Sequence, residues 1–206
     1  MFDLARIPAH VTLVAVTKTV PPERVDEALA AGITVFGENK IQEAKAKIPL
    51  VSSRAHWHFI GHLQTNKARD AVELFELIHS VDSVKLAGEL NKWADHAGKT
   101  QPILLEVNVA GESSKFGIKP EDVPSALTEI HRMSRLEVRG LMTVPPLKKD
   151  PRPYFRQLRE LRDATGLREL SMGMSHDFEI AIEEGATIVR IGTAIFGERK
   201  KYEPVE

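Results

Sequence analysis

The feature that most constrains the fold is a regular alternation of short apolar runs and longer amphipathic segments along the chain. The short runs are rich in β-branched residues, whereas the longer segments place apolar residues at helical spacing. Runs that are apolar almost throughout are typical of parallel strands whose outer face is covered by helices. We therefore expect strands at 12–17, 33–39, 56–64, 77–82, 102–110, 136–146, 167–175 and 186–197, and helices at 21–32, 40–48, 65–75, 83–98, 120–133, 153–166 and 177–185.

Eight such repeats predict a single-domain (β/α)₈ TIM barrel over residues 1–206, at the small end of that fold. The alternative is an open, doubly wound sheet. Against it, no glycine-rich dinucleotide fingerprint follows the first expected strand.

Composition removes several classes of function. Lys and Arg number 28 against 29 Asp and Glu, a net charge of -1, so no basic excess points to nucleic acid or an anionic membrane. The chain has no cysteine, which excludes disulfides, thiolate catalysis and cysteine-ligated metals. The N-terminal residues carry no signal-sequence pattern and no segment reaches transmembrane length, so we expect a soluble cytoplasmic protein.

Polar residues stand where the expected strands end. In (β/α)₈ barrels the active site lies at the carboxyl ends of the strands. The alternative for each residue is that the chain is merely returning to water. The candidates are Lys18, Asn39, His62, Asp82, Asn108, Met142, Thr143, Ser175 and residues 190–193.

Lys18 is the most unusual of these residues, because it directly follows the apolar run "LVAV" and one threonine. It could be a surface lysine at a strand exit. Held at a barrel mouth and partly desolvated, it would instead have a lowered pKa, and its neutral amine could form a Schiff base with an aldehyde.

A second signal lies near the end of the chain. Ser175 follows the seventh expected strand, and Gly192 and Thr193 follow the eighth, where barrels of this kind commonly bind phosphate. Helix capping by Ser175 and a simple bend at Gly192 are the alternatives. Arg190 interrupts the apolar run "ATIVRIG", and a buried guanidinium needs a partner, either a ligand nitrogen or a nearby carboxylate.

The histidines are weaker candidates. His56 and His58 stand two apart on one expected strand, as metal ligands can, but no third ligand is evident and we favour a role without metal. The segment 111–117 resembles a flexible loop that covers the mouth.

Taken together, the motifs resemble the pyridoxal 5'-phosphate homeostasis proteins, single-domain barrels similar to the N-terminal domain of fold-type III enzymes such as alanine racemase. The resemblance runs from about Leu13 to Gly197. It is carried, in order, by "LVAVTK", "FGENKIQEA", "WHFIGHLQTNK", "VNVAGESSKFGI", "GLMTVPP" and "LSMGMSHDFEIAIEEGATIVRIGTAIFG".

The resemblance implies pyridoxal 5'-phosphate as cofactor and a role in vitamin B6 homeostasis without an established turnover. It implies a Schiff base on Lys18, with Asn39 beside the cofactor and Arg190 at the pyridine nitrogen. It further implies a phosphate cup made of Ser175, Gly192 and Thr193. Other B6 vitamers are possible ligands, and a monomer or weak dimer is expected.

Three departures from the family pattern stand out. Few residues precede the first expected strand, where relatives usually carry a helix that covers the barrel, so the sequence does not decide how the barrel closes or which oligomeric state forms. The segment before "LRELSMGMS" is shorter than usual. His176 stands where an acidic residue is common after "GMS".

Two enzymatic alternatives remain: a racemase or decarboxylase with the same cofactor, and an aldolase whose lysine attacks a sugar phosphate directly. An efficient racemase is disfavoured, because fold-type III racemases supply a tyrosine from a separate domain as the second acid/base. The tyrosines here are Tyr154, on an expected outer helix, and Tyr202, in the tail.

Overall fold

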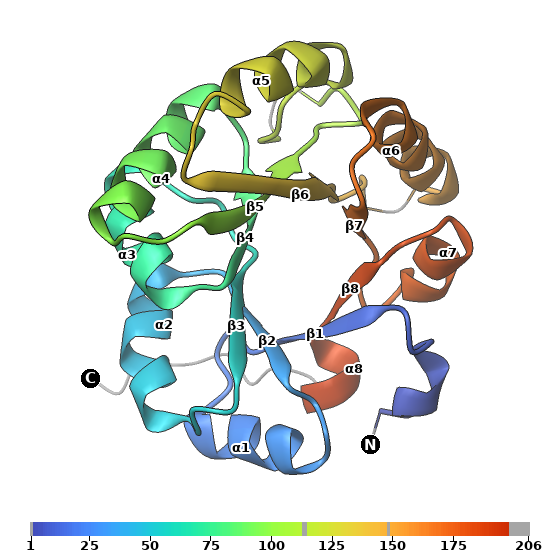
Figure 1. Cartoon of the computed structure of the whole chain (residues 1–206). Coiled ribbons are helices and arrows are strands. Elements are labelled where there is room, and N and C mark those ends of the chain that lie inside the picture. Colours follow the sequence, from blue (N-terminus) through green and yellow to red (C-terminus); the bar gives the residue numbers. More distant parts are fainter. Residues whose placement is uncertain (1, 113–114, 148, 198–206) are drawn as a thin grey trace.

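The computed structural model describes residues 2–112, 115–147 and 149–197, and this part of the chain forms a closed barrel of parallel strands (Figure 1). The strands follow one another around the barrel in sequence order, and the last pairs with the first through Val14 and Arg190. The strands are β1 (Thr12–Val16), β2 (Val35–Glu38), β3 (His56–Phe59), β4 (Leu77–Val81), β5 (Gln101–Glu106), β6 (Leu136–Met142), β7 (Glu169–Ser171) and β8 (Ile188–Ile191). The predicted (β/α)₈ fold is confirmed, and the open doubly wound sheet is excluded.

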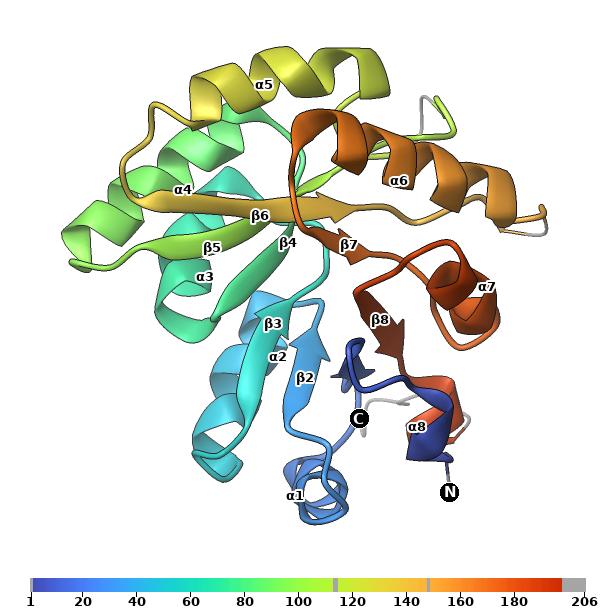
Figure 2. The same cartoon turned by 45° about the vertical axis from the view of Figure 1, so that its right-hand side comes forward.

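Helices form an outer layer around this barrel (Figures 1 and 2). Short 3₁₀ turns accompany them at Leu4–Arg6 (η1), Ile48–Leu50 (η2), Thr65–Lys67 (η3) and Pro120–Asp122 (η4). The helices are α1 (Pro22–Ala30), α2 (Ile41–Lys47), α3 (Ala68–Leu74), α4 (Val84–His96), α5 (Val123–Ile130), α6 (Arg152–Thr165), α7 (Phe178–Glu183) and α8 (Thr193–Phe196).

All eight strands are shorter in the structure than predicted, and for two of them the structure shows where the chain goes instead. The strand predicted at 186–197 ends at Ile191, and its remainder turns into the short helix α8. The strand predicted at 56–64 ends at Phe59, after which the chain crosses the end of β2: a Cβ on Gly61 would lie 2.2 Å from the Asn39 carbonyl oxygen. Only glycine permits this approach, so pairing stops where the backbones cross.

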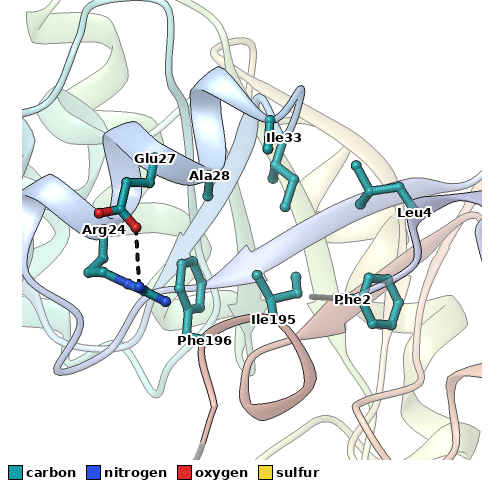
Figure 3. A pocket seen from close by; sticks show the side chains of 9 residues that line it. Phe2, Leu4, Arg24, Glu27, Ala28, Ile33, Ile195 and Phe196 are labelled. Carbon is teal, nitrogen blue, oxygen red and sulfur yellow. Dashed lines mark ion pairs between the residues drawn. The ribbon is translucent and has the colours of Figure 1, made fainter.

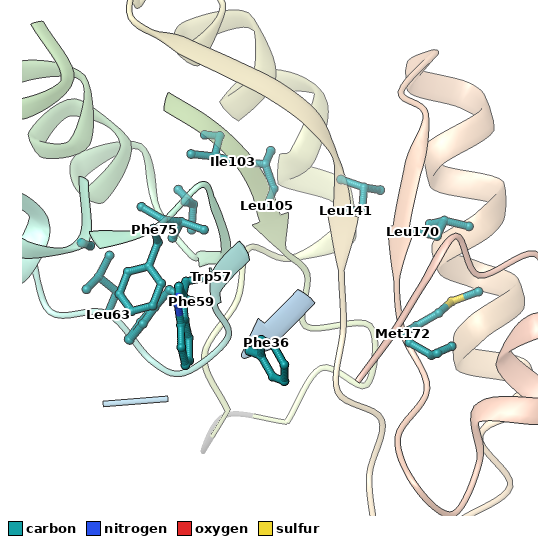
Figure 4. Packing of buried hydrophobic residues seen from close by; sticks show 14 of the residues in the cluster. Phe36, Trp57, Phe59, Leu63, Phe75, Ile103, Leu105, Leu141, Leu170 and Met172 are labelled. Carbon is teal, nitrogen blue, oxygen red and sulfur yellow. The ribbon is translucent and has the colours of Figure 1, made fainter. Parts of the chain in front are cut away.

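The main hydrophobic core lies between the barrel and the helices. Large side chains from the outer faces of the strands fill it, together with residues from the helices (Figure 4). Examples from β2, β3 and β5 are Phe36, Trp57, Phe59, Ile103 and Leu105.

A second, smaller apolar cluster fills the barrel interior and consists of Val14, Leu77, Leu104, Met142 and Ile188. Successive side chains of a strand point to opposite faces, so the residue two positions further along also faces inward. After Leu77, Leu104 and Ile188 these inward residues are polar: His79, Glu106 and Arg190. The interior is therefore an apolar layer overlaid by a polar one on the side of the strands' carboxyl ends.

The N-terminal segment packs on the outer wall of the barrel. Phe2 meets Phe178 of α7 edge-on, with ring centroids 5.8 Å apart, and Arg6 pairs with Glu179 at 2.7 Å. With α1 and α8, this segment forms a partly open, mostly apolar pocket of about 130 Å³ lined by Phe2, Leu4, Arg24, Glu27, Ala28, Ala31, Ile33, Ile195 and Phe196 (Figure 3). The described strands close into a barrel through the pairing of β8 with β1, which answers the question of barrel closure raised by the sequence.

Candidate functional site

Lys18 occupies a tight turn immediately after β1. The amide of Val20 donates to the carbonyl of Thr17 at 2.9 Å, which closes a four-residue turn with Lys18 at its second position. Thr19, at the third position, has φ +62° and is the one non-glycine residue with positive φ in the described ranges. Such a turn ordinarily carries glycine or asparagine at this position. Lys18 itself is half-buried.

An ion-paired cluster backs this turn on the outer wall of the barrel. Lys47 of α2 donates to Glu38 at 2.6 Å, to Glu43 at 2.9 Å and to the Thr17 carbonyl at 2.6 Å. The Thr17 hydroxyl donates to Glu38 at 2.6 Å. Burial raises the pKa of Glu38 above its ordinary value, while the contacts with Lys47 and Thr17 oppose that rise. We call Thr17, Glu38, Glu43 and Lys47 the outer ionic cluster.

The loops after β7 and β8 contact each other at the ends of the two strands that precede β1 around the barrel. The amide of Gly192 donates to the Ser175 hydroxyl at 3.4 Å. Because β8 lies between β7 and β1, these two residues and Lys18 follow three neighbouring strands. The loop after β7 reaches this position through Gly173, which has φ +90° and whose Cβ would lie 2.5 Å from that of Ala181.

Ser175 does not cap α7, which begins three residues later at Phe178. Asp177 precedes that helix and accepts from the Met174 amide at 2.6 Å. Thr193 is exposed and is the first residue of α8, and His176 is exposed as well. Ser175 therefore has a contact with the loop after β8 in place of a capping bond.

Arg190 is buried inside the barrel, as its position in an apolar strand predicted. Its guanidinium donates from Nη1 to the Ser171 hydroxyl at 2.6 Å and from Nη2 to the Thr143 carbonyl at 2.9 Å. Burial lowers the pKa of Arg190 to about 10, and the nearby carboxylates of Glu106 and Asp177 oppose this shift. The side chain thus stays cationic at neutral pH.

Two histidines extend this arrangement across the barrel. Ser171 lies 2.8 Å from Nδ1 of His79, and Nε2 of His79 lies 3.0 Å from Nδ1 of His58. Burial lowers the pKa of His79 well below 6.5 and that of His58 to about 4. Both rings are therefore neutral at pH 7, each with one donor and one acceptor nitrogen. We call His58, His79, Ser171 and Arg190 the inner polar chain.

Glu106 is a further ionisable group of the polar layer. Its pKa is raised to about 7, mainly by burial and also by Asp82, while Arg190 opposes the rise. Its protonation state therefore changes near neutrality, at the place where the strands' carboxyl ends meet.

Two amide side chains at the same end of the barrel have unused acceptors. Among the described residues, Oδ1 of Asn39 and Oδ1 of Asn108 are buried without a hydrogen-bond partner. A buried acceptor without a donor costs about 1–3 kcal/mol. Asn39 therefore suits a ligand that donates a hydrogen bond at the mouth.

The loop after β5 reaches toward the loop after β3. The ring of Phe116 stacks on that of His62 with centroids 3.5 Å apart and planes 11° apart. His62 also lies 3.4 Å from Asp82. The sequence-based idea that segment 111–117 covers the mouth is consistent with this contact, although residues 113–114 lie outside the description.

Several polar residues of this region were missed by sequence reasoning, namely Glu38, Lys47, His79, Glu106 and Ser171. A signal did exist for His79, because it stands in the otherwise apolar run "LIHSV" just as Arg190 stands in its own strand. Lys47 is an ordinary helical lysine by sequence. Only the packing of α2 on the barrel reveals that it is buried.

The remaining sequence candidates have other surroundings. His56 is exposed and lies 2.9 Å from Glu76, while its neighbour His58 faces the interior. No cluster of three or more potential metal ligands occurs among the described residues. Within the same ranges, no helix is long and apolar enough to cross a membrane. Tyr154 packs against the core from α6, and Tyr202 lies outside the described residues.

Comparison with known proteins connects this geometry to a family. Residues 4–200 match the family model of the alanine racemase N-terminal domain. The chain is 48% identical over 198 residues to the pyridoxal phosphate homeostasis protein of Aquifex aeolicus, covering 91% of this chain and 87% of that protein. The protein of the same name from Pseudomonas aeruginosa is 47% identical over 200 residues, covering 94% and 87% of the two chains.

Solved structures agree with this relationship. PipY of Synechococcus elongatus, solved with pyridoxal phosphate bound, has a TM-score of 0.88 and 38% identity, covering 94% of this chain and 95% of that chain. An alanine racemase of Clostridium difficile has a TM-score of 0.74 at 11% identity, covering 96% of this chain and 55% of that chain. The latter likeness concerns the fold alone.

Proposed function

Since the chain belongs to the alanine racemase N-terminal domain family, we propose that it binds pyridoxal 5'-phosphate at the barrel mouth and serves in the homeostasis of this cofactor. The proposed attachment is a Schiff base with Lys18. The relatives named as pyridoxal phosphate homeostasis proteins and the ligand of PipY support this proposal.

The observation that carries the proposal is the position of Lys18 next to Ser175 and Gly192 around the barrel. Closure of β8 onto β1 brings together residues that are more than 150 positions apart in the sequence. A lysine can react with the aldehyde of a ligand, and a hydroxyl with backbone amides can bind its phosphate. Residues of both kinds follow neighbouring strands here.

The other residues of the mouth fit the same ligand. Ser175, Gly192 and Thr193 would hold the phosphate, and the unused acceptor of Asn39 would face a donor of the ligand. Arg190, cationic and a donor only, would lie at the pyridine nitrogen. Bound pyridoxal phosphate supplies an aldehyde and an electron-accepting ring, and an arginine at its nitrogen leaves that nitrogen unprotonated and weakens the electron sink.

We further propose that the protein is a binding protein with slow side reactions at most, in place of an efficient racemase. Racemisation needs an acid/base on each face of the substrate carbon, and a missing one typically removes a factor of about 10²–10⁴. Lys18 serves one face. Tyr154, the tyrosine of the described ranges, lies on the outer helix α6.

A single domain over residues 1–206, a cytoplasmic location, a monomer or weak dimer, and exchange of other B6 vitamers remain predictions. Size-exclusion chromatography with light scattering measures the assembly, and competition with pyridoxal and pyridoxine 5'-phosphate measures vitamer exchange.

The test is to add pyridoxal phosphate to the purified protein, record the absorption spectrum and reduce with borohydride. We expect a yellow protein and a reduced adduct that peptide mass spectrometry assigns to Lys18. Lys18→Ala should abolish the absorption band and the adduct, because no other amine is held by the turn after β1.

Lys45→Ala is the matched control, because Lys45 pairs with Asp70 on the outer surface and should leave the adduct intact. Equal trapping on another lysine would refute the assignment to Lys18. A protein that stays colourless but forms a reducible adduct with a sugar phosphate would favour the aldolase. Rapid α-deuteration of L-alanine in deuterated water, lost in Lys18→Ala, would favour the racemase.

A further inference from the structure

We infer that Glu43 is a positioning residue for Lys18: its carboxylate holds the Thr17–Val20 turn in a strained conformation that directs the Lys18 amine into the barrel mouth. This inference rests on the proposed function, since it concerns how the Schiff-base lysine is presented. It assigns a role in ligand attachment to a residue of α2 on the outer wall of the barrel.

The turn is tied to α2 by two separate contacts. The backbone amide of Thr19 donates to Oε1 of Glu43 at 2.5 Å, and the Thr17 carbonyl accepts from Lys47 at 2.6 Å. Lys47 in turn donates to Glu43 at 2.9 Å, which fixes the carboxylate beneath the turn. The backbone on both sides of Lys18 is thus held by one charged pair.

The backbone conformation of Thr19 explains why a contact with Glu43 is needed. At φ +62° its β-branched side chain occupies the left-handed region, where threonine is disfavoured and glycine is at ease. Residues in such conformations persist only when the surroundings hold them there. A charge-assisted bond from Glu43 to the Thr19 amide is a direct restraint of this kind.

The restraint acts on Lys18 through the geometry of the turn. Along β1, Val14 faces the barrel interior and Ala15 faces the outer core, so the alternation continues with Thr17 outward and Lys18 inward. Thr17 meets this expectation, because its hydroxyl donates to the outer-wall residue Glu38. If Thr19 relaxed to negative φ, the peptide plane between Lys18 and Thr19 would rotate, and the backbone that carries the Lys18 side chain would shift.

The test compares two ligands that share the phosphate and the ring. Pyridoxal 5'-phosphate can form the Schiff base, whereas 4'-deoxypyridoxine 5'-phosphate has no aldehyde. In Glu43→Ala we expect affinity for pyridoxal phosphate to fall about five- to thirtyfold, the range set by strain of this size. Affinity for the deoxy analogue should be unchanged.

Three further variants sharpen the result. Glu43→Gln keeps an acceptor for the Thr19 amide and should retain most of the affinity. Thr19→Gly combined with Glu43→Ala should regain it, because glycine adopts the turn without restraint. Lys45→Ala, on the same helix, should behave as the unaltered protein. Equal loss of both ligands in Glu43→Ala, or no recovery in the double variant, would overturn the inference.

A ligand-free measurement separates this inference from the proposed function. The three-bond coupling between the amide and α protons of Thr19 reports its φ, and we expect it to change in Glu43→Ala but not in Lys45→Ala. If the coupling is unaltered, the positioning role is wrong even where the cofactor binds. If it changes while the unaltered protein forms no borohydride adduct, the Schiff-base proposal fails and the restraint on the turn stands.

Discussion

The outer ionic cluster and the inner polar chain lie on opposite sides of the barrel wall, and their charged residues have different kinds of partner. In the outer ionic cluster, Lys47 meets the carboxylates of Glu38 and Glu43 directly. In the inner polar chain, Arg190 donates to a hydroxyl and a carbonyl, and its nearby carboxylates act at longer range. The cation of the outer ionic cluster is thus in direct contact with carboxylates, whereas the cation of the inner polar chain is buried in the barrel interior with neutral hydrogen-bond partners.

From this difference we infer that the outer ionic cluster supports the turn of Lys18, whereas the inner polar chain contributes to ligand binding. Matched charges on the outer wall restrain the turn of Lys18 and leave little potential for a ligand. The unmatched guanidinium inside the barrel costs desolvation free energy, which a ligand atom that accepts a hydrogen bond would offset. We therefore expect substitution of Lys47 to act mainly on stability, and substitutions in the polar layer of the barrel interior to act on the pH dependence of stability and on ligand binding.

The largest effect is expected from Lys47→Met. It leaves the buried carboxylate of Glu38 without its cation, which typically costs about 3–5 kcal/mol in the free energy of unfolding, measured by urea denaturation. Lys45→Met on the same helix removes only a surface pair and should cost at most about 1 kcal/mol.

The double variant Glu38→Leu with Lys47→Met tests the cause of this loss. Replacing a buried ion pair by apolar residues is often neutral, so stability should largely return if an unpaired charge is responsible. A double variant as unstable as Lys47→Met alone would point to packing instead.

A smaller, pH-dependent effect is expected from Glu106→Gln. The pKa of Glu106 is about 7 in the fold against an ordinary value of 4.5, so the folded protein holds this proton more tightly than the unfolded chain. Its contribution to stability is complete below pH 4.5, declines as the pH rises, and is lost above pH 7. That shift corresponds to about 3 kcal/mol as an upper value.

Urea denaturation at pH 4 and pH 8 measures this effect. Glu106→Gln should be more stable than the unaltered protein at pH 8, with the gain absent at pH 4. Asp122→Asn, at an exposed position in η4, is the control and should show no such pH-dependent gain. A gain of the same size at both pH values would show that burial does not hold Glu106 protonated.

The smallest effect is expected from Ser171→Ala. It removes the hydroxyl that accepts from Arg190 and contacts His79, and an unsatisfied buried group costs about 1–3 kcal/mol. Ser80→Ala is a matched control one position after His79, because Ser80 is equally buried but its hydroxyl has no hydrogen-bond partner among the described residues. Equal unfolding free energies for the two variants would argue against a cooperative inner polar chain.

Much of the site could be located from local patterns. Lys18 and Arg190 stood out because each is a cation at the end of, or within, an apolar strand, and such a residue must be either partnered or functional. Ser175 and Gly192 were placed by the rule that barrel sites lie at the carboxyl ends of strands. Their proposed roles toward pyridoxal phosphate remain predictions, although their proximity to each other is observed.

The ends of the strands and helices were harder to predict from the sequence. The end of β3 depends on Gly61 passing the backbone of Asn39, and α8 begins directly after Gly192, whose amide donates to Ser175. Both are contacts between segments that sequence periodicity does not describe. The hydroxyl of Ser171 and the carbonyl of Thr143, which accept from Arg190, were likewise not indicated by the sequence, and the contact of Arg190 with a ligand nitrogen remains a prediction.

By itself, the sequence determined the fold class and the order of the strands, because apolar periodicity is a local property and consecutive parallel strands connected by helices pair in order. Tertiary structure alone decided that Lys47 is buried against Glu38, and that Glu43 accepts from the amide of Thr19, a residue with positive φ. These features depend on side chains that meet only after the helices pack on the barrel. The sequence around a charged residue does not show whether packing will bring an oppositely charged partner to it.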